Sequence, residues 1–352
     1  FDEFIMTIGK IINIGIIGIG TIGKRHLMAI NQVNDINIVG VVDITESAQK
    51  FCSDKNIPFF KSLNDLLKSH EVDGVVVSTP TINHHENAIA ALKVGLDVLI
   101  EKPISATVVE AEEIAGMAIK YGCKVLVGHQ RRFYPLVLKT KEIVKNNELG
   151  NIIGISGIWA LRKDKEYFSP DWRKKITAGP VITNLIHDID YLRFIFGDIE
   201  QVSAISSNSI NSFEKEDALV ANLKFKNGIL GNFLITDSGT SPWAWETATG
   251  ENIYLPNLAE NNLRIIGTEG SLEFPNLKMW KYKGKGIDWR DELFSDLKKP
   301  SDVDPYVSQI NHFKDIINRN IDPITDSDDG KLTLNVALSI LESANKQKVI
   351  KI

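Results

Sequence analysis

The chain has 352 residues, of which 43% are hydrophobic and 24% charged, and its formal net charge is −5 at pH 7. This composition is typical of a globular protein, and the length exceeds one ordinary hydrophobic core, so we expect two domains. The negative charge disfavours a protein held on nucleic acid by phosphate contacts, and no apolar run approaches the length of a membrane span. We therefore expect neither nucleic acid nor membrane as a partner.

The cysteines and histidines point away from disulfides and metals. Cys52 and Cys123 lie far apart and form no CxxC pair, and the seven histidines are scattered without zinc-site spacing. The opening stretch, FDEFIMTIGK, lacks the cationic head and apolar run of a secretory signal. We predict no metal site and a reducing, cytoplasmic location.

The first part of the chain alternates strand-like and helix-like segments. Short Val/Ile-rich runs predict strands at 11–17, 36–42, 73–79, 97–101 and 124–128. Between them, helices are predicted at 21–34, from about 46 onward, at 85–95 and at 107–122. Near-continuous apolar strands separated by helices are typical of a parallel sheet covered on both faces. We therefore predict an α/β fold in which residues 1–128 form a doubly wound, Rossmann-type sheet.

The pattern changes after residue 128. A helix is predicted at 135–147, followed by alternating strands at 151–161, 218–228 and 229–236 and a pair within 263–274. The turns KNG and EG join neighbouring runs as hairpins. Residues 129–352 are therefore predicted to form an α+β domain with a mostly antiparallel sheet. The polar segment 237–262 is predicted to be a long loop over the active site.

A glycine-rich turn joins the first predicted strand to the first predicted helix. Gly18, Gly20 and Gly23 fit the pattern G-x-G-x-x-G. The first glycine allows a tight turn, the second lets the backbone approach a diphosphate, and the third lets the helix pack on the strand. Free N–H groups at the helix N-terminus favour a phosphate there. We predict dinucleotide binding by the whole turn, Gly18, Ile19, Gly20, Thr21, Ile22 and Gly23; a glycine-rich turn without a ligand is the alternative.

An acidic residue follows at the spacing that the dinucleotide interpretation requires. Asp43 lies 20 positions after Gly23, at the end of the second predicted strand. A carboxylate there accepts hydrogen bonds from an adenosine ribose and would repel a 2′-phosphate, so NAD is favoured over NADP. A helix cap at the strand end is the alternative role for Asp43.

Two further strand ends carry polar residues. Thr79 and Pro80 follow the third predicted strand, and Glu101, Lys102 and Pro103 follow the fourth. Ligands bind at the carboxyl ends of strands in such sheets, so we predict that Thr79, Pro80, Glu101 and Lys102 contact the cofactor. Pro103 restricts the backbone and thereby holds Lys102. A solvent-facing lysine, and a proline that only stops the strand, are the alternatives.

Residues 181–197 predict an amphipathic helix with a histidine on its polar side. Its apolar residues recur at intervals of three and four: Ile182, Leu185, Ile186, Ile189, Leu192 and Phe196. The opposite side carries Asn184, His187, Asp188 and Tyr191. Histidine suits proton transfer because its unperturbed pKa lies near neutrality. A solvated polar face is the alternative.

The chain resembles the Gfo/Idh/MocA oxidoreductases over nearly its whole length. The stretches that carry the resemblance are GIIGIGTIGKRH, TPTINHHENAIAALKVGLDVLIEKPIS, GHQRRFYP, AGPVITNLIHDIDYLRFIFG and PYVSQINHFKDII. The resemblance implies a Rossmann domain followed by a substrate-binding domain whose open-faced sheet often forms a homodimer or homotetramer. It also implies NAD(P)-dependent hydride transfer on small-molecule sugars, polyols or cyclitols.

The resemblance also implies catalytic roles for two residues. Lys102 matches the catalytic lysine of the family's Glu-Lys-Pro motif, where the peptide bond before the proline is often cis, and His187 matches its general acid/base. Members similar to inositol dehydrogenase carry an aspartate four residues before this histidine, where this chain has Thr183. The orienting carboxylate is therefore either missing or supplied by another residue, for which Asp190 is the candidate. Asp190 and Asn184 are predicted to contact the substrate, and inositol itself is not implied as that substrate.

Other residues match family positions near the ligands. The resemblance implies cofactor contacts for His84, Trp172 and Arg173. Arg131, in the stretch HQRRF, and Tyr306 are predicted to contact the substrate. Alternatives from the residues themselves are a helix cap for His84, a packed tryptophan beside a solvated arginine, and a salt bridge at the domain boundary for Arg131.

These observations predict an NAD-dependent dehydrogenase. His187 would accept the hydroxyl proton of a sugar, polyol or cyclitol, and Lys102 would stabilise the developing negative charge. Alternatives are a keto-sugar reductase, a glycosidase that oxidises transiently and retains its NAD, and a dinucleotide-binding sensor without catalysis. The sensor predicts decay of the catalytic pair, whereas Lys102 and His187 are both present.

Overall fold

The computed structural model describes residues 11–252, 254–283, 288–298 and 303–352, so the prediction about the opening ten residues lies outside it. The chain divides into two compact units. The first combines Phe1–Phe133 with Val303–Leu334, and the second combines Tyr134–Asp302 with Asn335–Ile352. The predicted division after residue 128 differs from this one, because Val303–Leu334 belongs to the first unit.

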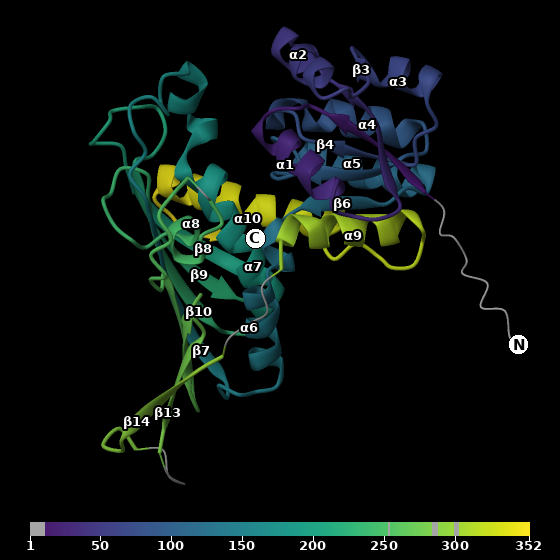
Figure 1. The fold of residues 1–352 in the computed structure, drawn as a ribbon. Helices are drawn as coiled ribbons and strands as arrows, with labels where there is room; N and C mark the ends of the chain where they lie inside the picture. The colour runs from purple at the N-terminus through teal and green to yellow at the C-terminus, as the bar shows by residue number, and fades with distance from the viewer. Residues whose placement is uncertain (1–10, 253, 284–287, 299–302) are drawn as a thin grey trace, which may run out of the picture. The chain divides into compact units, whose positions relative to one another are not determined.

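The first unit is built on a six-stranded parallel sheet in the order β3-β2-β1-β4-β5-β6 (Figure 1). Its strands are β1 (Ile12–Ile17), β2 (Ile36–Val42), β3 (Phe59–Phe60), β4 (Gly74–Val77), β5 (Asp97–Glu101) and β6 (Val125–Gly128). The order reverses beside β1, which pairs with both β2 and β4. The predicted doubly wound sheet is confirmed; β3 was not predicted, since two residues are too few to give a periodic signal.

Helices connect these strands. They are α1 (Thr21–Ile30), α2 (Glu46–Asp54), α3 (Leu63–Ser69), α4 (His84–Lys93) and α5 (Val108–Tyr121), with short 3₁₀ turns η1 (Thr81–Asn83) and η2 (Gln130–Phe133). Helix α5 shows how local sequence sets the boundaries: Thr107 and Glu110 form a capping box at its start, and Gly122 ends it at φ 67°.

Helix α9 (Pro305–Ile317) completes the core of the first unit (Figure 1). Its side chains Ile310, Phe313 and Ile316 are buried in the same cluster as Ile14 and Leu99 of the parallel sheet. An apolar helix face in a sequence does not say which core it will cover. For this reason the sequence could not place the segment in the first unit.

The second unit is built on a nine-stranded sheet in the order β14-β13-β12-β11-β7-β10-β9-β8-β15. Its strands are β7 (Ile152–Ala160), β8 (Ile199–Ser207), β9 (Ala218–Phe225), β10 (Leu230–Thr236), β11 (Leu263–Gly267), β12 (Ser271–Phe274), β13 (Lys278–Tyr282), β14 (Leu293–Leu297) and β15 (Ile350–Lys351). The predicted hairpins β9–β10 and β11–β12 are confirmed as antiparallel pairs, and β10 runs parallel to β7. The sheet is mostly antiparallel, as predicted.

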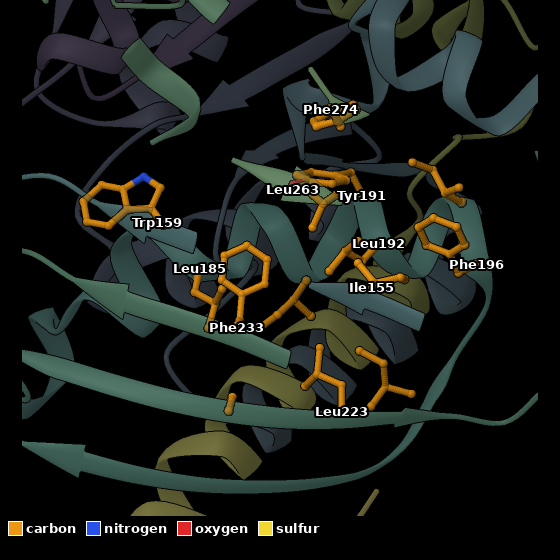
Figure 2. Close-up of a cluster of buried hydrophobic side chains, with 14 of the residues drawn as sticks. Ile155, Trp159, Leu185, Tyr191, Leu192, Phe196, Leu223, Phe233, Leu263 and Phe274 are labelled. Atoms are coloured by element: carbon orange, nitrogen blue, oxygen red, sulfur yellow. The ribbon is translucent and has the colours of Figure 1, made fainter. Parts of the chain in front are cut away.

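Helices pack on one face of this sheet. They are α6 (Pro135–Lys145), α7 (Ile186–Phe196), α8 (Trp245–Thr249) and the part of α10 (Ser327–Lys346) that follows Leu334, with 3₁₀ turns η3 (Asp171–Lys174) and η4 (Ile176–Ala178) and a π-helical turn η5 (Val181–Leu185). Figure 2 shows Leu185 and Leu192, from the segment that includes α7, beside Ile155 and Phe233 of the strands. None of the helices among the described residues is long and apolar enough to cross a membrane.

The prediction that residues 237–262 form a long loop is wrong in part. It contains the short helix α8, and Trp245 at its start is fully buried against Tyr134, Tyr191 and Phe274. A tryptophan in a polar segment therefore serves the core here, because long-range packing decides its position.

Candidate active site

The glycine turn between β1 and α1 is closely packed at two of its three glycines. Gly18 has φ +90°, and a Cβ there would lie 2.8 Å from the Thr79 amide nitrogen. A Cβ on Gly23 would lie 2.1 Å from the carbonyl oxygen of Gly18. Ser78, a residue not predicted, donates from its Oγ to the same carbonyl at 2.7 Å. These contacts join the turn to the end of β4.

Gly20 differs from its two neighbours in the turn. Its backbone lies at φ −66° and ψ −162°, and a Cβ on it would have no heavy atom within 4 Å. It is the N-cap of α1, no side chain caps that helix end, and the first turn carries no acidic residue. Open space beside uncapped N–H groups suits an anionic group such as a dinucleotide diphosphate.

Asp43 is fixed against this turn. Its Oδ2 accepts a hydrogen bond from the backbone N–H of Ile19 at 3.0 Å, and its Oδ1 accepts from the N–H and hydroxyl of Thr45 at 2.9 and 2.8 Å. Burial raises the pKa of Asp43, but these hydrogen bonds outweigh it and hold the pKa below its ordinary value. Thr45, rather than Asp43, caps α2 by accepting from Ala48. Asp43 is therefore an ionised carboxylate beside the glycine turn.

His84 links the ends of β4 and β5. Its ring is buried, with Nδ1 2.8 Å from the carbonyl oxygen of Pro103 and Nε2 2.8 Å from that of Thr79. Burial lowers the pKa of His84 against the opposing effect of the two carbonyls. Because both nitrogens are engaged, a cofactor contact would involve the ring carbons. The Lys102–Pro103 peptide bond between these loops is cis, as the resemblance implied.

Glu101 belongs to a buried network beside Lys102. Its Oε1 lies 2.6 Å from Nε2 of the fully buried His26, and its Oε2 accepts from the Lys102 N–H at 3.2 Å. Burial raises the pKa of Glu101, but His26 and Lys102 together hold it below the ordinary value. The rings of His26 and Tyr306 meet edge to face at 5.5 Å, and the Arg25 guanidinium lies 4.4 Å over Tyr306. Sequence analysis missed His26, although it stands at the end of GKRH.

The predicted polar face of the His187 helix is wrong in part. All of α7 except Phe194 is buried. Asp188 accepts a hydrogen bond from the Tyr191 hydroxyl at 2.8 Å, and both are fully buried, with Tyr191 stacked on Phe274 at 5.5 Å. Polar side chains can be buried when they form hydrogen bonds with each other. A helical wheel shows only that they are polar, so it does not distinguish such buried residues from an accessible polar face. Asp190 is also fully buried, whereas His187 is 9% exposed.

A π-helical turn leads into this helix, and Glu216 caps it. The Val181 N–H donates to Oε1 of Glu216 at 3.0 Å, and a Cβ on Gly179 would meet the same carboxylate at 2.1 Å. Next to Glu216, Lys215 and Asp237 form a fully buried ion pair at 2.7 Å. Sequence analysis missed Glu216 because the contact spans 35 positions.

Glu216→Gln is expected to stabilise the protein near neutral pH. Burial raises the pKa of Glu216 above its ordinary value, despite the opposing effect of the Val181 N–H. The folded state therefore holds more protons than the unfolded state between the two pKa values, and stability falls as pH rises through that window. Glutamine removes this penalty and still offers an oxygen to Val181. Thermal unfolding at pH 7.5 should show a gain on the order of 1 kcal/mol, or about 3 °C in Tm.

At pH 4.5 the same gain should shrink, because the wild-type carboxyl is then increasingly protonated. Glu214→Gln is the matched control, since Glu214 is exposed and paired with Lys175 at 2.6 Å. A glutamine variant of residue 216 that is less stable than wild type at pH 7.5 would contradict the expectation.

The remaining predicted residues lie in both units. Arg131 is buried in η2 of the first unit. In the second unit, Trp172 is 59% exposed, and Arg173 donates from Nη1 to the Tyr167 carbonyl at 2.8 Å. Asn184 accepts from Nζ of Lys163, a residue not predicted, at 3.0 Å. Lys102 lies in the first unit and His187 in the second.

Sequence models of one family match both units. "Oxidoreductase family, NAD-binding Rossmann fold" matches residues 12–129, and "GFO/IDH/MocA C-terminal domain" matches residues 137–273. Glucose-6-phosphate 3-dehydrogenase of Bacillus subtilis is 30% identical over 236 residues, covering 65% of this chain and 67% of that protein. Myo-inositol 2-dehydrogenase of Thermotoga maritima is 23% identical over 351 residues, covering 96% and 98%.

A solved structure gives the same fold. The WlbA dehydrogenase from Bordetella pertussis, in complex with NADH and UDP-GlcNAcA, superposes with a TM-score of 0.78 at 23% identity. The alignment covers 98% of this chain and 99% of that one. The fold of each unit is therefore shared with that structure, over almost the full length of the chain.

Proposed function

The chain belongs to the Gfo/Idh/MocA oxidoreductase family, and from this premise we propose that it is an NAD-dependent dehydrogenase that oxidises a hydroxyl group of a sugar, polyol or cyclitol. The single observation that carries the proposal is the open position at Gly20. The other two glycines of the turn are packed against backbone, whereas a Cβ placed on Gly20, at the uncapped start of α1, would meet no protein atom within 4 Å. Backbone N–H groups there suit the diphosphate of the cofactor.

Cofactor binding is assigned to the first unit. We propose that residues 18–23 hold the diphosphate, that Asp43 accepts from the adenosine ribose, and that the ends of β4 and β5 flank the nicotinamide half. Ionised Asp43 supports NAD over NADP because it would repel a 2′-phosphate. Bound NAD would supply the hydride acceptor. Contacts of Pro80, Glu101, Trp172 and Arg173 with the cofactor belong to the same proposal.

Two side chains are proposed to carry the proton and charge. His187 accepts the proton of the substrate hydroxyl, and Lys102 donates a hydrogen bond to the same oxygen and stabilises negative charge on it. Glu101 and His84 act as positioning residues, because they hold the backbone on both sides of Lys102. Asp190 orients His187, and Arg131, Asn184 and Tyr306 contact the substrate.

Assays of the purified protein test the proposal directly. NADH formation is measured with a panel of sugars, polyols and inositols, and reduction of keto-sugars is measured with NADH. Net NADH formation on at least one alcohol is the expected result. Tightly retained NAD with hydrolysis of a glycoside and no net NADH would show a glycosidase, and NADH oxidation only with a keto-sugar would show a reductase. Dinucleotide binding without turnover on any substrate would favour the sensor.

We also propose a homodimer or homotetramer in the cytoplasm. The open face of the second sheet supports assembly, because exposed apolar side chains line up across neighbouring strands: Ile205, Val220 and Leu234 in one row, and Leu230 and Ile266 in another. Two free, buried cysteines support a reducing compartment. Light scattering on the eluting protein gives the molar mass that tests the assembly.

A further inference from the structure

Lys163 contacts Asn184, and Asn184 lies three residues before His187 in the chain. It follows β7, and its backbone N–H donates to the Asp237 carbonyl at 2.9 Å. Its Nζ donates to Oδ1 of Asn184 at 3.0 Å and to the Tyr167 hydroxyl at 3.2 Å. Asn184 precedes His187 by three residues, so the ammonium group is held beside the start of the helix that carries His187.

No carboxylate of the described residues lies within 4.0 Å of this ammonium group. Asp164, the nearest acid along the chain, is exposed and accepts from the Tyr167 N–H at 2.7 Å. Glu166 is exposed as well. The charge of this half-buried lysine is therefore not neutralised by a carboxylate of the described residues, and it stays available to an anionic group.

Tyr167 fixes the position of this cation. Its ring centroid lies 4.5 Å from Nζ of Lys163 and 4.1 Å from the guanidinium carbon of Arg173. Arg173 also donates to the Tyr167 carbonyl at 2.8 Å. The same ring therefore gathers two positive charges. An anion bound beside them would be attracted by both.

The hydrogen-bond directions leave donors of this cluster without a partner among the described residues. An ammonium group only donates, so the amide oxygen of Asn184 must face Lys163, and the Thr183 hydroxyl donates to the same oxygen at 2.9 Å. The Asn184 Nδ2 has no partner among the described residues. Lys163 keeps a third N–H, because two of its three are engaged. The cluster therefore presents charged and neutral donors and no acceptor carboxylate.

We propose that Lys163 and Asn184 form an oxyanion-binding subsite that selects a substrate carrying a carboxylate or phosphate beside the carbon whose hydroxyl group His187 deprotonates. The inference rests on the proposed dehydrogenase function and narrows its substrate class to anionic sugars or cyclitols. Thr183 fits this subsite because its hydroxyl is uncharged, whereas a carboxylate at that position would compete for Lys163.

Calorimetric titration of the NAD⁺-loaded, full-length protein tests the subsite. The probes are matched sets: glucose, glucuronate and glucose 6-phosphate; galactose, galacturonate and galactose 6-phosphate; myo-inositol and an inositol monophosphate. At least one anionic sugar or inositol should bind at least about 10-fold more tightly than its neutral counterpart. Comparing the carboxylates with the phosphates shows which anion is preferred. Lys163→Gln should lower the affinity for that anionic ligand by about 10- to 100-fold, while the affinity for NAD⁺ stays unchanged.

Two further variants keep the test decisive. Lys163→Arg retains the charge and should retain the anion preference, and Arg162→Gln removes an exposed neighbouring cation and should change nothing. Equal or tighter binding of neutral members, no binding of any anionic member, or loss of NAD⁺ rather than substrate affinity in Lys163→Gln would overturn the subsite. Failure of the wild type to bind NAD⁺ would instead overturn the proposed function.

Discussion

Lys102→Met is expected to lower kcat by about 100- to 1,000-fold, while NADH still binds. Methionine keeps the length of the side chain but removes the positive charge that would stabilise the substrate oxygen as its proton leaves. The backbone around residue 102 is held by the Glu101 carboxylate and by His84 through Pro103, so the loop should keep its conformation. Steady-state turnover on the substrate found in the screen and NADH fluorescence titration measure the two quantities.

Lys93→Met is the matched control, because Lys93 is an exposed lysine at the end of α4 in the same unit. It should leave both turnover and NADH binding unchanged. Near-normal turnover of Lys102→Met would remove Lys102 from the mechanism. Loss of NADH binding in that variant would assign the lysine to the cofactor instead.

Gly20→Ala is expected to weaken NAD binding by about 10- to 100-fold with little change in stability. The added methyl group meets no atom of the protein within 4 Å, and the backbone angles at Gly20 are open to alanine. It would, however, occupy the space that the diphosphate needs. Calorimetric titration with NAD⁺, together with a Tm that stays within about 2 °C of wild type, is the expected pair of results.

Two other glycines separate binding from folding. Gly23→Ala places a Cβ 2.1 Å from the Gly18 carbonyl oxygen, so it should destabilise the fold by about 1–3 kcal/mol or more. Gly116→Ala lies within α5, where a Cβ meets nothing within 4 Å, and should stabilise slightly without affecting NAD⁺. Unchanged NAD⁺ affinity in Gly20→Ala would show that the diphosphate lies elsewhere.

Sequence by itself determined the parallel sheet of the first unit and the residues at its carboxyl end. Buried parallel strands are continuous apolar runs, and their ends bear the glycine turn, Asp43, Thr79 and Lys102, so local pattern and the rules of βαβ connection suffice. The hairpins β9–β10 and β11–β12 also followed from local pattern, since a short turn pairs the adjacent runs.

Strands without that local signal needed the tertiary structure. The edge strand β14 is exposed along its whole length, and β8 carries polar residues over half of its length, so neither gives a clear alternation. Both become strands because a neighbour offers backbone hydrogen bonds, which is a property of the sheet rather than of the segment.

Only the tertiary structure decided which polar groups form hydrogen bonds inside the protein and which remain accessible to a ligand. Asp188 accepts a hydrogen bond from Tyr191 inside the hydrophobic core, whereas His187, the residue before Asp188, keeps some exposure. Lys163 meets Asn184 across 21 positions, and Glu216 reaches Val181 across 35. Helical periodicity records only neighbours three or four residues apart, so contacts at such separations arise from how the loops after β7 and β8 pack around the start of α7.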